Sequence, residues 1–218
     1  MSIKRPDGFT RVLKGVGKMN IAVIASGRGT NFEAIVKATK YGKLKRIKVK
    51  LLITDKKDAY AIIRARKYQI KDLFVDPKRF KSRRDFDKEI ISILKKEKID
   101  LVVLAGFMRI LTPYFIREFK NKILNIHPAI LPAFKGIDAI ERAFRYGVKV
   151  TGVTVHFIDE KVDHGPIILQ KVLKVRENEP LEKLEERIHK LEHQLYPEAI
   201  RLFAEGKLKI KNRYVKII

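Results

Sequence analysis

Two short polar segments, each placed directly after a strand-like stretch, are the residues of this chain best suited to chemistry. Asn125 and His127 follow the apolar residues at 123–124, and Asp163 follows the alternating apolar stretch 151–158. Where apolar strands form an open α/β sheet, side chains at the strand ends meet at one edge, and active sites form there. We therefore expect an amide, an imidazole and a carboxylate to lie together at that edge.

These three side chains match the needs of an amine that attacks a neutral acyl group. The reaction needs a hydrogen-bond donor for the developing oxyanion, an acid–base group that titrates near neutral pH, and a carboxylate that tunes it. Taken singly, Asn125, His127 and Asp163 are ordinary turn or loop residues. Their combination, and not any one of them, predicts acyl-transfer chemistry.

A glycine-containing turn between the first apolar strand and a helix predicts an anion site. Residues 26–31 read Ser-Gly-Arg-Gly-Thr-Asn, so that Gly29, Thr30 and Asn31 come at the start of the helix. Backbone N–H groups at such a helix N-terminus bind phosphate. The dinucleotide fingerprint lacks its third glycine because position 32 is Phe, and no Lys-Ser/Thr pair follows. The turn therefore fits a phosphate monoester, or else a tight strand–helix connection with Asn31 near the cap.

Two further segments have both a chemical and a structural interpretation. In the stretch 104–111, Met108, Ile110 and Leu111 can line a flat apolar pocket, although a Met-aromatic stretch is more often core. Residues 189–193 read His-x-x-Glu-His, the spacing of an inverted zinc-protease motif. No further ligand accompanies this motif, so a polar helix face is favoured over zinc, with Glu192 able to face a cleft. We predict no metal site.

Apolar strands alternate with helical segments along most of the chain. Strands are expected at 20–25, 49–53, 70–75, 100–105, 123–126, 150–158 and 167–175, with strand-like alternation at 207–218. Helices are expected from Phe32 onward and at 59–67, 83–96, after 112–113, 137–146 and 180–204. This alternation predicts an α/β fold whose parallel sheet is covered on both faces. Residues 1–18 are expected to form a basic N-terminal extension and residues 19–218 a single domain.

Composition excludes several classes of protein. The 218 residues include no cysteine, which removes disulfides, thiolate zinc sites and cysteine nucleophiles and suits a reducing cytoplasm. No run of about 18 apolar residues is present, so no membrane-spanning helix is expected. The 49 Lys and Arg residues against 25 Asp and Glu give a net charge of +24, which attracts polyanions. Because these residues are spread out without interleaved aromatics, small anionic substrates are preferred to a specific nucleic-acid partner.

Taken in order, these segments resemble one family, the phosphoribosylglycinamide formyltransferases. The resemblance rests on motifs at 26–31, 105–111, 125–128, 131–132, 156–157 and 163–168, and it covers about residues 19–208. It implies the formyltransferase fold, with a Rossmann-like, mostly parallel N-terminal half that binds the nucleotide phosphate and a mixed C-terminal half that binds folate. The implied reaction moves the formyl group of the co-substrate 10-formyltetrahydrofolate to the amine of 5'-phosphoribosylglycinamide, a step of de novo purine biosynthesis.

The resemblance also implies a role for each matching residue. Asn125 would lie at the formyl group, His127 would be the proton donor, and Asp163 would raise the pKa of His127. The nucleotide substrate would be bound by Gly29, Thr30, Asn31 and Glu192. Folate would be bound by Asn125, Arg83, Met108, Arg109, Ile110 and Leu111. Two positions depart from the family pattern, Ile140 in the helix after 131–132 and His164 beside Asp163.

Other interpretations remain open beside this one. A formyltetrahydrofolate deformylase shares the Asn-His-Asp constellation but normally carries an N-terminal regulatory domain, and a methionyl-tRNA formyltransferase adds a C-terminal domain. A basic nucleic-acid-binding module, from a different class, predicts salt-dependent RNA affinity without turnover. Small-molecule substrates, a cytoplasmic location and a monomeric or homodimeric state are expected.

Overall fold

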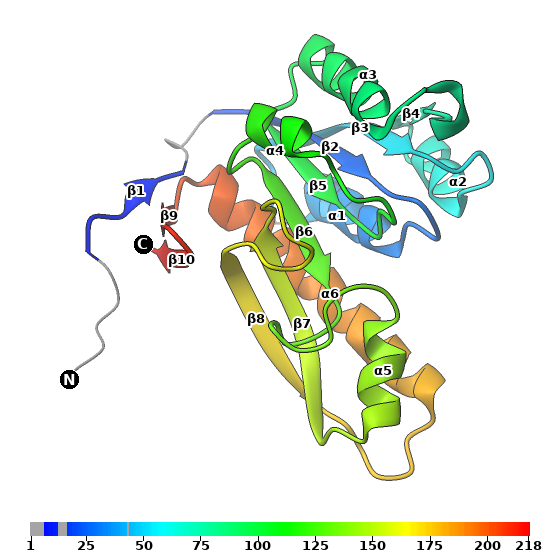
Figure 1. Cartoon of the computed structure of the whole chain (residues 1–218), viewed down its shortest axis with the longest axis vertical. Helices are drawn as coiled ribbons and strands as arrows, with labels where there is room; N and C mark the ends of the chain where they lie inside the picture. The colour runs from blue at the N-terminus through cyan, green and yellow to red at the C-terminus, as the bar shows by residue number, and fades with distance from the viewer. Residues whose placement is uncertain (1–6, 13–16, 43) are drawn as a thin grey trace.

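A seven-stranded sheet forms the centre of the protein (Figure 1). The computed structural model describes residues 7–12, 17–42 and 44–218. The strands lie in the order β4-β3-β2-β5-β6-β7-β8. They span β2 (Met19–Ile24), β3 (Ile47–Thr54), β4 (Lys71–Phe74), β5 (Leu101–Leu104), β6 (Ile123–His127), β7 (Val150–Phe157) and β8 (Ile167–Lys174).

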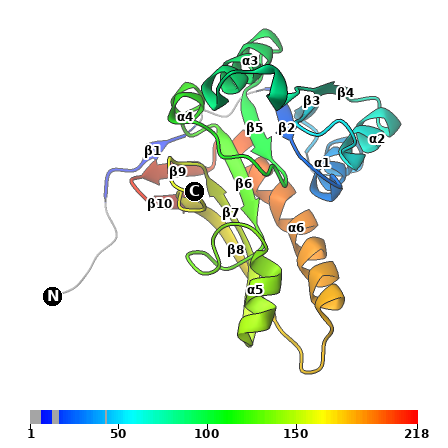
Figure 2. The same cartoon turned by 45° about the vertical axis from the view of Figure 1, so that its right-hand side comes forward.

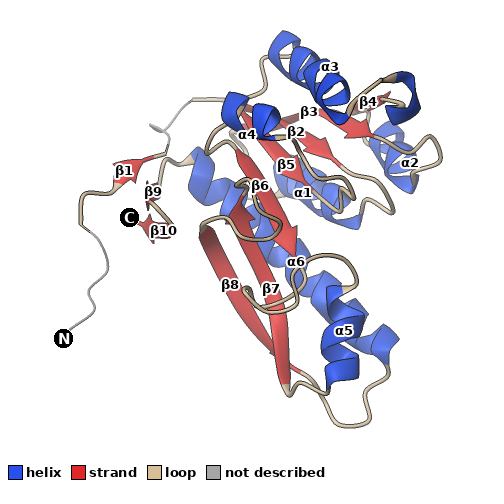
Figure 3. Ribbon diagram, in the orientation of Figure 1, coloured by secondary structure: helices blue, strands red, loops and turns tan. Residues whose placement is uncertain are grey.

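Helices pack on both faces of this sheet (Figure 3). One face is covered by α1 (Thr30–Tyr41), α2 (Tyr60–Lys67), α5 (Ala139–Tyr146) and the long α6 (Leu181–Ala204). The other face is covered by α3 (Arg83–Lys96) and α4 (Pro113–Glu118), with a short 3-10 helix, η1 (Pro77–Arg79), before α3. Strands such as β2 and β5 carry apolar residues on both sides. They do so because a parallel sheet between two helical layers has no solvent face.

The direction of the strands divides the sheet into two halves. From β4 to β6 every neighbouring pair is parallel, whereas β6 with β7 and β7 with β8 are antiparallel. The predicted Rossmann-like, mostly parallel sheet with a mixed C-terminal half is therefore confirmed. The order of the parallel strands reverses between β2 and β5, and at such a point a crevice opens outside the carboxyl ends of the strands.

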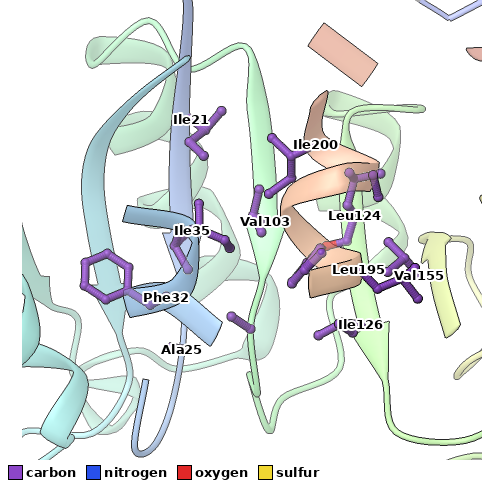
Figure 4. Packing of buried hydrophobic residues seen from close by; sticks show 14 of the residues in the cluster. Ile21, Ala25, Phe32, Ile35, Val103, Leu124, Ile126, Val155, Leu195 and Ile200 are labelled. Atoms are coloured by element: carbon purple, nitrogen blue, oxygen red, sulfur yellow. The ribbon is translucent and has the colours of Figure 1, made fainter. Parts of the chain in front are cut away.

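Helix α6 joins the two halves through one continuous apolar core. Figure 4 shows Leu195 and Ile200 of α6 beside the sheet residues Leu124 and Val155. Between them, the buried Tyr196 hydroxyl lies 2.7 Å from the carbonyl oxygen of Leu104 and 2.9 Å from that of Leu124. These two carbonyls belong to β5 and β6, so the tyrosine fixes the helix against the strands that lead into the crevice.

A second, small sheet joins the two ends of the described chain (Figure 2). It consists of β1 (Thr10–Arg11), β9 (Leu208–Lys211) and β10 (Tyr214–Ile217), all antiparallel. The strand-like alternation at 207–218 is thus a hairpin. Of the predicted extension 1–18, residues 1–6 and 13–16 lie outside the described residues, while 10–11 pair with β9.

One helix begins later than its sequence pattern predicts. The helix expected at 137–146 starts at Ala139, because Asp138 has a left-handed backbone with φ 53° and ends the preceding loop. Ile137 is accordingly exposed rather than part of the helical stripe. In the described part of the chain, no helix is both long and apolar enough to cross a membrane.

Candidate active site

A pocket of about 830 Å³ opens where the strand order reverses. Its volume lies within the range of small-molecule sites. The turn after β2, the segment after β5, the end of β6, the loop after β7 and the middle of α6 all contribute to its wall. Nearly all the predicted site residues line it: Gly29, Thr30, Asn31, Met108, Arg109, Ile110, Leu111, Asn125, His127, Asp163 and Glu192.

His127, the last residue of β6, has an acceptor at each ring nitrogen. Nε2 lies 2.9 Å from the carbonyl oxygen of Phe134, and Nδ1 lies 3.3 Å from Oδ2 of Asp163. A neutral imidazole has one N–H, so only the protonated ring can donate to both acceptors. The side chain is only 5% exposed. The site therefore offers a hydrogen-bond acceptor to each nitrogen of a protonated His127 ring.

Two opposing effects act on the proton of His127. Burial lowers the pKa of His127 below its ordinary value, because a buried charge loses its hydration. The Asp163 carboxylate and the Phe134 carbonyl act in the opposite direction. The predicted influence of Asp163 on the pKa of His127 thus has the expected sign, but burial exceeds it in the free protein. A further negative charge brought by a substrate would favour the protonated ring.

Asp163 is held by its backbone and by hydrogen bonds. It has a left-handed conformation with φ 44°, which aims its side chain back across the pocket, and Oδ2 accepts the Gly136 N–H at 2.7 Å. Burial alone would raise the pKa of Asp163, but the hydrogen bond from the Gly136 amide and the nearby His127 oppose burial, and the pKa of Asp163 lies below its ordinary value. The carboxylate is therefore ionised at neutral pH and faces the His127 imidazole as an anion.

Asn125 is oriented by a residue whose role the sequence does not reveal. His156 of β7 places Nδ1 2.7 Å from the carbonyl oxygen of Phe157, so Nδ1 carries the hydrogen and Nε2 is the acceptor. The Asn125 amide nitrogen lies 3.2 Å from that Nε2 and 3.4 Å from Oδ1 of Asp163. His156 is fully buried and fixes which end of the Asn125 amide is the donor.

Removing the acceptor of His156 is expected to slow the reaction. In His156→Phe the Asn125 amide loses the partner that sets its orientation, and kcat should fall about tenfold, the effect of one hydrogen bond. His156→Gln, which keeps an acceptor oxygen, should recover part of the rate. Steady-state kinetics of both variants checks this, and a His156→Phe enzyme with the kcat of the wild type would contradict it.

At one end of the pocket lies the first turn of α1, where the sequence predicts an anion site. Gly29 has φ 68°, and a Cβ there would lie 2.7 Å from Cβ of Ala61, so only glycine fits this turn. No side chain caps the helix, which leaves its first N–H groups available. Next to them, the Asn31 amide nitrogen donates to Oε2 of Glu192 at 3.0 Å, which joins the turn to α6.

At the other end, the segment after β5 presents apolar side chains to solvent. Met108 is 65% exposed and Ile110 57%, an unusual exposure for such residues that suits an apolar ligand. Ser26 accepts the Met108 N–H at 3.0 Å and so anchors the segment to the turn after β2, while Leu111 is buried beneath it. Arg109 lies over the Phe86 ring, 5.2 Å from its centroid.

One predicted residue lies apart from the others. Arg83 is the exposed first residue of α3 and is not among the residues that line the pocket. Its proposed contact with folate stays a prediction. Two backbone groups that the site uses, the Phe134 carbonyl and the Gly136 N–H, also have no signal in the sequence because they belong to no side-chain pattern.

The His-x-x-Glu-His spacing on α6 does not form a metal centre in the described residues. No group of three or more His, Cys, Asp or Glu side chains there is arranged to hold a metal ion. His189 instead contacts Glu192, with Nδ1 2.9 Å from Oε2. His189 and Glu192 thus form a polar pair on α6.

An imidazole, a carboxylate and an amide between an uncapped helix N-terminus and an apolar wall are the parts required by an enzyme that transfers a small acyl group to a phosphorylated acceptor. Comparison with known proteins identifies the family. A model of the formyl transferase family, "Formyl transferase", matches residues 19–200, and the chain belongs to this family. This confirms the enzyme class, the formyltransferase fold and the resemblance stated on the sequence motifs.

Individual relatives point to the same branch of the family. The chain is 46% identical over 180 residues to the phosphoribosylglycinamide formyltransferase of Bacillus subtilis, covering 83% of this chain and 92% of that protein. It is similar to the crystal structure of glycinamide ribonucleotide transformylase 1 from Symbiobacterium toebii, with 44% identity and a TM-score of 0.89. The match covers 93% of this chain and 95% of that chain. For the crystal structure of glycinamide ribonucleotide transformylase 1 from Geobacillus kaustophilus, the identity is 46% and the TM-score is 0.83. The match covers 86% of this chain and 99% of that chain.

Proposed function

We propose that this enzyme transfers the formyl group of 10-formyltetrahydrofolate to the amine of 5'-phosphoribosylglycinamide, giving formylglycinamide ribonucleotide and tetrahydrofolate. One observation carries the proposal: the Asn125, His127 and Asp163 cluster lies between an uncapped helix N-terminus and an exposed apolar segment. The first suits a phosphate and the second a flat folate ring. The similarity to proteins named for this reaction supports it.

The chemistry follows from the charges around the three side chains. The substrate amine attacks the formyl carbon, a C–N bond forms, and negative charge develops on the formyl oxygen. The Asn125 amide donates to this oxyanion, and His127, whose protonated form the added negative charge favours, stabilises it electrostatically. The ionised Asp163 holds the imidazolium and takes part in moving the proton from the new ammonium to the folate nitrogen. The bond between the formyl carbon and that nitrogen then breaks.

The two substrates are assigned to opposite ends of the pocket. The phosphate is bound by the backbone of Gly29, Thr30 and Asn31, and Glu192 contacts the rest of the nucleotide. The folate ring lies against Met108, Arg109, Ile110 and Leu111, which brings its formyl group to Asn125. Arg83 would contact the acidic tail of the folate from outside the pocket wall. This arrangement needs no metal.

One assay distinguishes the proposal from its alternatives. Tetrahydrofolate release from 10-formyltetrahydrofolate is measured with and without 5'-phosphoribosylglycinamide. Release that requires the nucleotide supports the transferase, and release without it supports a deformylase. No release, together with salt-dependent RNA affinity, would support a nucleic-acid-binding module instead. The cytoplasmic location stays a prediction. The monomeric or homodimeric state also stays a prediction, and size-exclusion chromatography tests it.

A further inference from the structure

The loop between β7 and β8, residues 158–166, carries Asp163 and is closed by one of its own carboxylates. Oδ1 of Asp159 accepts the Lys161 N–H at 3.0 Å, and Oδ2 lies 2.7 Å from Nδ1 of His164. One side chain thus joins residues on both sides of Asp163. Because a carboxylate is an acceptor, Nδ1 of His164 carries a hydrogen in this contact, and Nε2 of the neutral ring is left as an acceptor.

A cation from the C-terminal hairpin lies against this histidine. Arg213 stands in the turn between β9 and β10, and the hairpin lies beside the loop 158–166 (Figure 2). Nη1 of Arg213 lies 2.8 Å from Nε2 of His164 and 3.0 Å from its Nδ1, so the guanidinium group lies across the ring. A guanidinium is a donor only, and Nε2 is the ring atom that can accept from it.

The hairpin that carries Arg213 is itself fixed to the main body of the protein. Leu208 of β9 is buried, and Ile210 and Val215 pack against the same core as α6 and the large sheet. Strand β9 is the central strand of the small sheet, paired with β1 on one side and β10 on the other. The turn therefore holds Arg213 on a rigid support outside the pocket.

The backbone at Asp163 needs such support from its surroundings. Its φ of 44° is uncommon for a residue other than glycine, and a conformation of this kind persists only where neighbouring contacts determine it. The Gly136 N–H holds the side chain of Asp163 from within the site. The next residue, His164, is held from the outside of the loop by Asp159 and by the hairpin.

We infer that Arg213, acting through His164, is a positioning residue for Asp163. The contact helps to keep Oδ2 of Asp163 at its distance of 3.3 Å from Nδ1 of His127. Arg213 is not among the residues that line the pocket, so it touches neither substrate. The inference rests on the proposed function, in which Asp163 moves a proton. A small displacement of such a group slows the reaction without weakening binding, so the effect belongs to kcat.

Removing the guanidinium group tests the contact directly. Arg213→Met keeps a long side chain but has no donor, and we expect kcat to fall about fivefold, the effect of one hydrogen bond, with both KM values within about twofold. Because Arg213 is exposed, the variant should stay folded, which circular dichroism checks. The matched control is Lys216→Met, which removes a cation from exposed β10 of the same hairpin and should leave kcat within about 1.5-fold.

Two variants of His164 separate positioning from simple packing. His164→Leu fills the space but can bond to neither partner, and kcat should fall about fivefold. In His164→Gln the amide nitrogen can donate to Asp159 and the amide oxygen can accept from Arg213, so most of the rate should return. Equal rates for the two variants would show that only the volume of the side chain matters and would contradict the inference.

A double variant tests whether Arg213 acts through the Asp163 carboxylate. In an Asp163→Asn background, Arg213→Met should change kcat less than twofold, because the group that it positions is already lost. Two independent effects would instead multiply, and the fivefold loss would remain. That outcome would overturn the inference, as would an Arg213→Met enzyme with the kcat of the wild type or a Lys216→Met enzyme as slow as Arg213→Met.

A second measurement keeps the inference separate from the proposed function. If the wild type transfers no formyl group at all, the proposed function fails, and the position of Asp163 is then followed through His127. The Asp163 carboxylate raises the pKa of His127, so its displacement in Arg213→Met should lower the pKa of His127. Titration of the ring by NMR, with the signal assigned from its absence in His127→Asn, measures this. An equal pKa in the wild type and in Arg213→Met rejects the inference.

Discussion

Replacing Asp163 with asparagine should lower kcat about a thousandfold, which is within the range of effects seen when an acid–base group is removed. KM for both substrates should stay within about threefold of the wild-type values. Asparagine keeps an oxygen that can accept the Gly136 N–H, so the loop keeps its anchor. It removes the negative charge that favours the His127 imidazolium and it cannot carry a proton. Steady-state kinetics with each substrate varied in turn measures both constants.

A neighbouring carboxylate provides the control for this experiment. Glu160 lies on the same loop, is exposed, and forms a long ion pair with Arg117 at 3.6 Å. Glu160→Gln should leave kcat within about twofold, since exposed ion pairs contribute little. If Asp163→Asn retained a rate within about threefold of the wild type, a barrier change under roughly 1 kcal/mol, the proposed role of Asp163 would be wrong.

Much of the site could be predicted from the sequence because its side chains stand at strand ends. The parallel strands are recognisable as short apolar runs, and the polar residue after such a run must lie at the carboxyl edge of the sheet. Asn125 and His127 at the end of β6, and Gly29 to Asn31 after β2, were accessible to this reasoning. The family motifs then supplied roles that position alone does not give.

The rest of the site depends on contacts that no local pattern encodes. His156 lies within the alternation of β7, where an inward-facing residue is normally part of the core, and only the antiparallel pairing with β6 places it opposite Asn125. The opposed effects of burial and Asp163 on the pKa of His127 require the packed structure. The pairing of residues 10–11 with β9 likewise joins segments from the two ends of the chain.

Gly165→Ala should be the most destabilising single methyl addition near the site. An added Cβ would lie 1.8 Å from the carbonyl oxygen of Phe157 and 2.8 Å from its carbonyl carbon, both backbone atoms that cannot rotate away. We expect the free energy of unfolding to fall by about 3 kcal/mol, the upper part of the range for overpacking. Urea unfolding followed by circular dichroism measures this loss.

The same substitution should reduce kcat even where the variant remains folded. The Phe157 N–H donates to the carbonyl of Pro166 at 2.9 Å, so Phe157 and Pro166 close the neck of the loop that carries Asp163. Separating Phe157 from Pro166 moves Asp163 relative to His127, whose Nδ1 lies 3.3 Å from Oδ2 of Asp163. Gly17→Ala is the matched control, because a Cβ there has nothing within 4 Å. If the Gly165→Ala enzyme were as stable and as active as Gly17→Ala, the loop would tolerate the added methyl group. The position of Asp163 would then not depend on the contact between Phe157 and Pro166.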